Sequence, residues 1–314
     1  PGTYFVTVKD GNGCTAVSPT SVTIYPPLDL TPTITALPTC ANDDGIITVA
    51  PAGGSGVYTY AISPNPATIS LTGNVFSGVP AGTYTITITD TTTLCSKDVA
   101  VSLSAATPVT FTTSVNNVSC NGGNDGIITI NLPASNDNPI YTYEITAGPI
   151  VFGPQNSNIF TGLVAGNYTV QVNSGRGCSN TEIVPVTEPT LLTVSGVATD
   201  FGCAPNNSVN TSTLTITEIG GTAPYTFSID GINYLSSNIF DIIDTGITQN
   251  INIYVKDVNG CIAFNTVSIL PLPVLTNATV GIATPIDCNN TGSVAITVTG
   301  GSGNFNYQML PGGL

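Results

Sequence analysis

The sequence predicts an all-β protein built as a tandem array of β-sandwich modules of about 80 residues each. The first observation behind this prediction is a repeated segment that contains a turn, a Tyr, an alternating apolar and Thr run, a polar turn and a Cys. It spans 1–14, 81–95 and 165–178, and a looser copy spans 249–261. The second is residue usage, because Thr, Val, Ile and Tyr fill the alternating runs and Gly, Pro, Asn and Asp separate them. Period-two alternation is typical of half-buried strands, and no stretch has a helical period of useful length.

Proline-containing junctions divide the chain into three complete modules and two partial ones. The complete modules are predicted at 28–107, 108–188 and 189–272. Residues 1–27 are expected to form the C-terminal part of a truncated module, and residues 273–314 the N-terminal part of another. Pro26 and Pro27 mark the first boundary because proline has no N–H to continue a strand ladder.

A tyrosine near the start of the penultimate strand refines the fold class. This residue is Tyr4, Tyr84, Tyr168 and Tyr254 in the successive copies. In immunoglobulin-like sandwiches a tyrosine at this place forms a tyrosine corner, in which its hydroxyl bonds to a nearby backbone group. We therefore expect immunoglobulin-like modules arranged as a rod, with these tyrosines in structural roles.

The composition argues against several classes of partner. Charged residues make up 7% of the 314 residues, against roughly 25% in ordinary soluble domains. Four Lys and Arg stand against eighteen Asp and Glu, which gives a net charge of −14. Nucleic acids and anionic membrane surfaces are bound through Lys and Arg, so neither is an expected partner. No apolar run reaches the length of about 18 residues that a membrane span needs, so no membrane insertion is expected within this sequence.

Eight cysteines recur at two places in the modules. Those before the second strand are Cys40, Cys120, Cys203 and Cys288, and those after the penultimate turn are Cys14, Cys95, Cys178 and Cys261. Because there is no CxxC pair and no His, a structural zinc site is disfavoured. Disulfides are favoured instead, and they indicate an oxidising, extracellular compartment.

Three disulfide patterns fit this spacing. The favoured one closes each module on itself through Cys40–Cys95, Cys120–Cys178 and Cys203–Cys261, with Cys14 and Cys288 paired outside this sequence or to a neighbouring module. Such loops of roughly 55–58 residues stabilise each module by about 4 kcal/mol. The second pattern crosses each junction, through Cys14–Cys40, Cys95–Cys120, Cys178–Cys203 and Cys261–Cys288. The third joins the first loop of one module to the penultimate loop of the next, as in Cys40–Cys178. The first and penultimate loops lie at opposite ends of a sandwich, which counts against the favoured pattern, and sequence alone leaves all three open.

The few basic residues lie close to cysteines. Lys9, Lys97, Arg176 and Lys256 are near the Cys that follows the penultimate turn, whereas Asp43, Asp44, Asp125 and Asp287 are near the other Cys. Our hypothesis is that successive modules place these cations against these carboxylates and so orient one another. The alternative is that they are solvated turn charges, because an exposed ion pair contributes only about 0–1 kcal/mol.

The sequence offers no catalytic constellation, so no enzyme activity is expected. Without His there is no Ser-His-Asp or Cys-His nucleophile system. The carboxylate pairs Asp43 with Asp44 and Asp241 with Asp244 lie in predicted turns and do not recur between modules. The turns NDDG, GGNDG and KDGNG lack the spaced carboxylates of a calcium loop, so turn chemistry is favoured over calcium and no cofactor is expected.

Four motifs together resemble a known repeat. They are Cys-x-x-x-(Asn/Asp)-Gly-x-Ile, Gly-Gly-…-Tyr-x-Tyr, Gly-(Thr/Asn)-Tyr-x-Val and Gly-Cys. The combination resembles the SprB-type repeats of large secreted cell-surface adhesins of gliding Bacteroidetes-like bacteria, and the immunoglobulin-like and PKD-like modules of related exported proteins. The motifs consist of turn and core residues, so they identify a scaffold and carry no functional site. The resemblance also implies an O-glycan on Thr91, because Asp90-Thr91-Thr92 fits the pattern that these bacteria use.

We therefore predict a non-catalytic structural and adhesive repeat region of a long extracellular surface protein, which forms a disulfide-stapled stalk or fibre. The expected partners are neighbouring modules of the same chain and identical chains in a fibre, and the surface or glycan ligand is left open. The alternatives are an array of carbohydrate-binding modules and the spacer region of a larger secreted enzyme. The absence of Trp and the inward positions of most Tyr count against exposed sugar-binding platforms.

Overall fold

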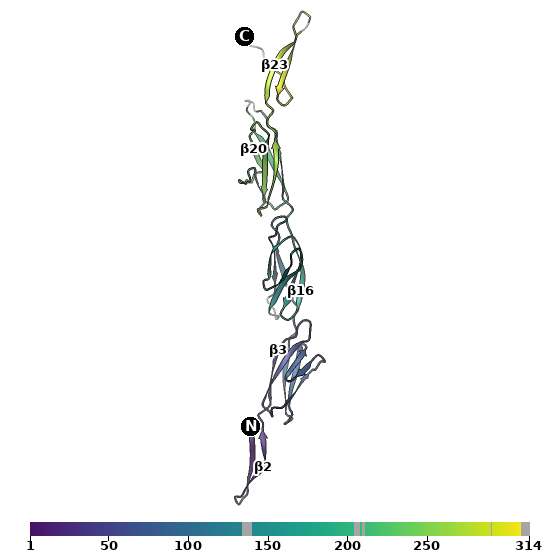
Figure 1. Cartoon of the computed structure of the whole chain (residues 1–314), viewed down its shortest axis with the longest axis vertical. Helices are drawn as coiled ribbons and strands as arrows, with labels where there is room; N and C mark the ends of the chain where they lie inside the picture. Colours follow the sequence, from purple (N-terminus) through teal and green to yellow (C-terminus); the bar gives the residue numbers. More distant parts are fainter. Residues whose placement is uncertain (134–139, 204–207, 209–210, 290, 309–314) are drawn as a thin grey trace. The chain divides into compact units, whose positions relative to one another are not determined.

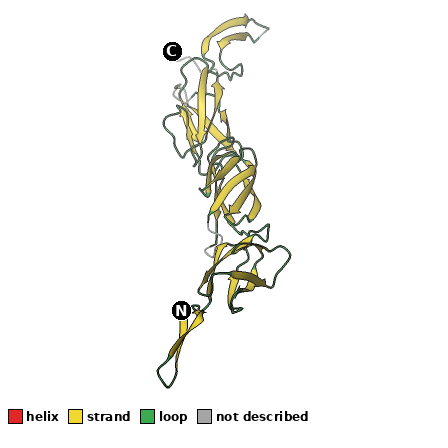
Figure 2. Ribbon diagram, turned by 60° about the horizontal axis from the view of Figure 1, so that its bottom comes forward, coloured by secondary structure: helices red, strands yellow, loops and turns green. Residues whose placement is uncertain are grey.

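The computed structural model describes residues 1–133, 140–203, 208, 211–289 and 291–308. All regular structure in these ranges is β-strand, as the ribbon in Figure 2 shows. Within the same ranges there is accordingly no helix that is long and apolar enough to cross a membrane. The predicted all-β class is confirmed.

The first sandwich contains seven strands: β3 (Asp29–Ala36), β4 (Gly45–Ala52), β5 (Tyr58–Ser63), β6 (Ser70–Thr72), β7 (Val75–Val79), β8 (Gly82–Asp90) and β9 (Ser96–Leu103). Its antiparallel sheets have the orders β3-β4-β7-β6 and β5-β8-β9. Lettered A to G in chain order, these are the ABED and CFG sheets of a constant-type immunoglobulin domain. Figure 1 labels β3 of this sandwich.

Alternation along the strands builds the core of the first sandwich. In β8 the side chains of Tyr84, Ile86 and Ile88 are buried, whereas the Thr residues between them face outward or are half-buried. Ile47 of β4 and Phe76 of β7 meet them from the other sheet. Burying such side chains contributes about 1.5–3 kcal/mol each, so this double layer accounts for the cohesion of the module.

The second sandwich differs in the place of its short strand. It consists of β10 (Thr112–Asn116), β11 (Gly126–Asn131), β12 (Tyr141–Ala147), β13 (Phe152–Gln155), β14 (Ile159–Leu163), β15 (Gly166–Ser174) and β16 (Ser179–Val186). The sheet orders are β10-β11-β14 and β13-β12-β15-β16. Here β13 pairs with the C strand β12, whereas in the first sandwich β6 pairs with the E strand β7. The fourth strand has therefore changed sheets between two copies of one repeat.

The third sandwich consists of β17 (Thr193–Ala198), β18 (Ser212–Ile219), β19 (Thr226–Ser228), β20 (Ile239–Ile242), β21 (Gln249–Lys256) and β22 (Ile262–Ile269). Its sheet orders are β17-β18-β20 and β19-β21-β22, which correspond to ABE and CFG. Leu214, Ile216, Ile253 and Val255 are fully buried in its core. Two hairpins complete the described structure, β1 (Gly2–Lys9) with β2 (Thr15–Ile24) and β23 (Leu275–Thr284) with β24 (Ser293–Gly300).

The chain divides into two compact units, and the division does not follow the sandwiches. One unit comprises Pro1–Asn116 and Gly126–Val186, and the other comprises Asn117–Asp125 and Thr187–Leu314. The segment Asn117–Asp125, which joins β10 to β11, thus belongs to the same unit as the third sandwich. Two kinds of turn matter below: the AB turns, 37–44 and 117–125, and the FG turns, 91–95, 175–178 and 257–261.

Candidate functional site: disulfide junctions between AB and FG turns

Both disulfides join the AB turn of one sandwich to the FG turn of the next. Cys40 is bonded to Cys178, and Cys120 is bonded to Cys261. The favoured intramodule pairing of the sequence analysis is therefore wrong, and the third pattern is the one found. The reason is geometric, because AB and FG turns lie at opposite ends of a sandwich and a disulfide requires Cα atoms within about 7 Å. The Cα–Cα distances are 5.0 and 5.7 Å.

Arg176 holds the first junction together. Its guanidinium, on a residue only 9% exposed, donates from Nε and Nη2 to the Pro38 carbonyl at 3.1 and 2.6 Å. Nη2 also donates to the Ser104 carbonyl at 2.8 Å, and Nη1 to the Ala105 carbonyl at 3.1 Å. In the opposite direction, the Cys40 N–H donates to the Arg176 carbonyl at 2.9 Å. The side chain therefore fastens the FG turn both to the AB turn and to the segment after β9.

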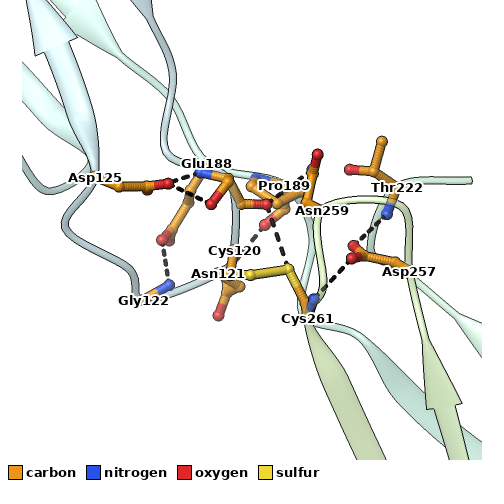
Figure 3. The surroundings of a disulfide bond; sticks show 11 residues. Cys120, Asn121, Gly122, Asp125, Glu188, Pro189, Thr222, Asp257, Asn259 and Cys261 are labelled. Carbon is orange, nitrogen blue, oxygen red and sulfur yellow. Dashed lines mark hydrogen bonds between the residues drawn. A yellow bond between two sulfur atoms is a disulfide. The ribbon is translucent and has the colours of Figure 1, made fainter.

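The second junction has the same plan with a neutral side chain in place of arginine. Asn259, two residues before its cysteine as Arg176 is before Cys178, donates from Nδ2 to the Ser119 carbonyl at 3.1 Å. The Cys261 sulfur lies 3.4 Å from the same carbonyl oxygen. This contact is not a hydrogen bond, because a sulfur in a disulfide has no proton to donate. Figure 3 shows these side chains converging on the Cys120–Cys261 bond.

Backbone and carboxylate contacts of the AB turn strengthen the second junction. Asn121 donates from Nδ2 to the Pro189 carbonyl at 3.1 Å. The Gly122 N–H donates to the Glu188 carboxylate at 2.6 Å (Figure 3). Both acceptors lie in the segment that leads into the third sandwich, so the AB turn is held by its partner turn and by the chain that follows β16.

An aspartate closes each AB turn on the residue before the cysteine. Asp44 accepts from the Thr39 N–H at 2.7 Å and from its hydroxyl at 3.0 Å. Asp125 accepts from the Ser119 N–H at 2.9 Å and from its hydroxyl. The Thr39 N–H bond is the main cause of the lowered pKa of Asp44, and the Ser119 hydroxyl bond is the main cause for Asp125.

Two further aspartates cap turns in the same way. Burial alone would raise the pKa of Asp90, but hydrogen bonds from Ser55, Thr92 and Thr93 outweigh it and hold that pKa well below its ordinary value. Hydrogen bonds led by the Asn233 N–H lower the pKa of Asp230 similarly. We call Asp44, Asp90, Asp125 and Asp230 the capping carboxylates.

Arg176 donates its hydrogen bonds to carbonyls, and its charge also contributes to the lowered pKa of Asp44 in the AB turn that it contacts, after the Thr39 hydrogen bonds, so its charge pairing stays a prediction. The hydrogen bonds of Asp44 and Asp125 are made to their own turns. Lys256 lies over the ring of Tyr234 in its own sandwich, with 4.2 Å from Nζ to the ring centroid. For Lys9, Lys97, Asp43 and Asp287 the pairing stays a prediction.

Two of the predicted tyrosine corners have the expected hydrogen bond. The buried Tyr84 donates its hydroxyl to the Pro80 carbonyl at 3.1 Å, and the buried Tyr168 donates to the Val164 carbonyl at 2.9 Å. Burial raises the pKa of both phenols. Tyr4 lies in β1 and is 51% exposed, so its role stays a prediction.

Tyr254 does not occupy the corner position. Counted back from the FG-turn cysteine, Ile251 takes the place that Tyr168 has in the second sandwich. Ile253 and Val255 point into the core, so the side chain between them faces away from it and packs near Phe264, with ring centroids 6.2 Å apart. The assignment of Tyr254 as a corner is therefore wrong, and the spacing to the cysteine was the signal that could have corrected it.

Four cysteines are exposed thiols: Cys14, Cys95, Cys203 and Cys288. Cys14 and Cys95 are the last residues of turns of the FG kind, and Cys203 and Cys288 follow strands of the A kind, so each occupies the place of a disulfide-bonded residue elsewhere in the chain. In the part of the chain that the structure describes, no group of three or more Cys, Asp or Glu side chains is placed to hold a metal ion. Thr91 is exposed and donates its hydroxyl to the Val57 carbonyl at 3.2 Å, and its glycosylation stays a prediction.

Comparisons with known proteins bear on the repeat. The comparable solved structures include the three N-terminal domains of the bacteriophage RB49 highly immunogenic outer capsid protein, at 12% identity and TM-score 0.37, covering 78% of this chain and 98% of that one. Another is a protocadherin gammaB7 EC3-6 cis-dimer, at 14% identity and TM-score 0.25, covering 86% and 84%. A tetra-tandem repeat in the extending region of a large adhesion protein has 16% identity and TM-score 0.24, covering 86% and 81%. With such low scores, nothing about function transfers from these structures.

The family comparison is more specific. The search of curated proteins gave no match. Three segments, 35–67, 112–149 and 280–314, match the family model of the SprB repeat. Each contains a cysteine of the AB kind, namely Cys40, Cys120 or Cys288. The chain is therefore similar to the SprB repeat over these three segments, and the first two lie within sandwiches of immunoglobulin-like topology.

Proposed function

We propose that this chain is a non-catalytic structural and adhesive repeat region of a long extracellular surface protein, and that it forms a disulfide-linked stalk. The observation that carries the proposal is the pair of AB-to-FG disulfides at two successive junctions. Each connects sandwiches that the backbone already connects, so neighbouring sandwiches are linked twice. Two links restrict bending and twisting more than one flexible linker does, which suits a region that must span distance.

The chemistry of the chain supports an extracellular site of action. Disulfides persist in oxidising compartments and are rare in the cytosol. With only four Lys and Arg, the chain offers few cleavage sites to trypsin-like proteases. The SprB repeats at 35–67, 112–149 and 280–314 agree with a surface adhesin.

One feature bears on the carbohydrate-binding alternative. A groove on the first sandwich is lined by Tyr58, Tyr60, Leu71 and Asn74, among others. However, Tyr58 donates its hydroxyl to the Gly53 carbonyl and Asn74 donates its amide to the Val49 carbonyl, so these polar groups already have partners. We therefore rank sugar binding second.

The test uses cells that produce the protein. Antibodies raised against this chain should label intact cells, and alkylation before reduction should spare Cys40, Cys120, Cys178 and Cys261. Deletion of 28–272 should reduce attachment of the cells to surfaces under flow. Labelling that appears only after permeabilisation, or alkylation of those four cysteines without reductant, would contradict the proposal. Selective binding of the chain on a glycan array, lost in Tyr60→Ala, would favour the alternative.

A further inference from the structure

We propose that the two disulfides interleave along the chain so that tension bypasses most of the sandwich residues and the region has a short maximum extension. This inference deepens the proposed function, since it states how the stalk would carry load. It depends on the covalent connections alone. It therefore holds whatever the placement of the two units.

The order of the cysteines along the chain is what creates the bypass. The first disulfide closes the segment from Cys40 to Cys178, a separation of 138 residues, and the second closes Cys120 to Cys261, a separation of 141. Because Cys120 lies inside the first loop and Cys178 lies inside the second, the loops overlap. Two separate loops would each shorten the chain independently, whereas overlapping loops share a segment and act together.

The positions of the cysteines on the strands make the bypass direct. Cys40 follows the A strand β3, and Cys178 immediately precedes the G strand β16. Cys120 follows the A strand β10, and Cys261 immediately precedes the G strand β22. Tension entering along β3 therefore passes through the first disulfide into the FG turn of the second sandwich, and the second disulfide delivers it to β22 of the third sandwich.

The shortest covalent path follows from this order. From Leu28 it runs to Cys40, across to Cys178, back along the chain to Cys120, across to Cys261 and on to Leu272. This path has about 80 residues, against about 245 along the backbone. At roughly 3.3–3.6 Å per extended residue, the disulfides shorten the fully stretched region by on the order of 560 Å. Residues 41–119 and 179–260 carry no load at full extension.

The contacts at the junctions keep both disulfides in the loaded path of the folded protein. Arg176 binds the Pro38 carbonyl two residues from Cys40, and Asn259 binds the Ser119 carbonyl next to Cys120. Each cysteine pair is therefore flanked by hydrogen bonds between the same two turns. A stretched sandwich can lose its strands while its ends remain fixed to its neighbours.

The overlap gives the proposal a distinctive signature. If only Cys40–Cys178 is removed, the shortest path still runs through Cys120–Cys261 and lengthens by about 22 residues, or about 75 Å. If only Cys120–Cys261 is removed, it lengthens by about 25 residues, or about 85 Å. If both are removed, it lengthens by on the order of 560 Å. The increase in length on removal of both disulfides is thus more than three times the sum of the two increases on removal of one disulfide each.

Single-molecule stretching of the full chain between handles at its termini tests this, after the exposed thiols have been blocked with iodoacetamide. Three variants replace the cysteines by Ser: Cys40→Ser with Cys178→Ser, Cys120→Ser with Cys261→Ser, and all four together. The final contour length is read after every sandwich has unfolded, so a variant that folds poorly still gives an answer. Reduced wild-type chain should match the fourfold variant.

The proposal would be overturned if the increases in contour length of the two variants that each lack one disulfide added up to the increase of the variant that lacks both. Additive increases would indicate two separate loops. A contour length that does not change on reduction would overturn it as well. Neither result depends on cell-surface labelling or on attachment. Failure of the bypass and failure of the proposed surface function are therefore distinguishable.

Discussion

Replacing Arg176 with Met should weaken the first junction by about 3 kcal/mol. The guanidinium makes four hydrogen bonds to three backbone carbonyls, those of Pro38, Ser104 and Ala105. A hydrogen bond to a charged group contributes about 1.5–3 kcal/mol. Two of the four share one acceptor, and water can reach part of the site after the change, so the net loss is smaller than the sum. Met keeps the aliphatic length and removes every donor.

The stability of the Cys40–Cys178 disulfide reports this loss. The hydrogen bonds hold together the same two turns that the disulfide joins, so their free energy favours the oxidised form. A loss of about 3 kcal/mol corresponds to about 65 mV for a two-electron couple, or about 150-fold in the equilibrium with dithiothreitol. Titration with dithiothreitol, followed by alkylation and peptide mass analysis, measures each disulfide separately.

The chain supplies its own control. Cys120–Cys261 belongs to the other unit, so Arg176→Met should leave its reduction midpoint unchanged. Arg176→Lys keeps the charge but has a single donor group, so it should give an intermediate shift. An unchanged midpoint for Cys40–Cys178 in Arg176→Met, or equal shifts at both disulfides, would refute the reasoning.

Three further predictions concern the sandwiches. Tyr168→Phe leaves the Val164 carbonyl without its partner and should lower the free energy of unfolding by about 1–2 kcal/mol in urea titrations, whereas Tyr254→Phe should have little effect. Gly220→Ala places a Cβ 2.1 Å from the Leu191 carbonyl oxygen at a φ of +81° and should lower the free energy of unfolding by about 3 kcal/mol. Gly246→Ala, at a φ of +77°, has open space around the new Cβ and should lower it by about 1 kcal/mol. Equal decreases in the same urea titrations would contradict this prediction. The capping carboxylates have pKa values lowered from 3.8 in the folded chain, so the unfolded chain binds more protons in acid. The stabilisation from these carboxylates is complete above pH 3.8 and is lost as the pH falls through their lowered pKa values. Thermal melts should therefore show Tm decreasing below about pH 4. A Tm that does not change with pH in this range would argue against the prediction.

The repeat, the strands and the turn residues could be predicted from the sequence because they follow local rules. Alternation in 82–90 places Tyr84 and Ile86 inward, and the structure has both side chains buried. The sheet choice of the short fourth strand was not predictable, since β6 and β13 are three and four residues long and carry no pattern that selects a partner.

The junctions were harder to predict because their chemistry involves the backbone. Arg176 was singled out as a charged residue at a junction, but its acceptors are carbonyls, which every residue has and which no sequence pattern marks. The spacing of the cysteines along the chain is compatible with three disulfide patterns, so spacing alone does not predict which one forms. AB and FG turns lie at opposite ends of a sandwich, and this geometry excludes the intramodule pattern.

The change of sheet by the fourth strand has a consequence for how such repeats can diversify. In the first sandwich β6 extends the sheet of β7, and in the second β13 extends the sheet of β12, yet in both sandwiches the cysteine of the AB turn is disulfide-bonded. The segment between the C and E strands thus tolerates rearrangement without disturbing the cysteines. A recognition loop could be grafted there, in any copy, and the linkage to neighbouring copies would survive the graft.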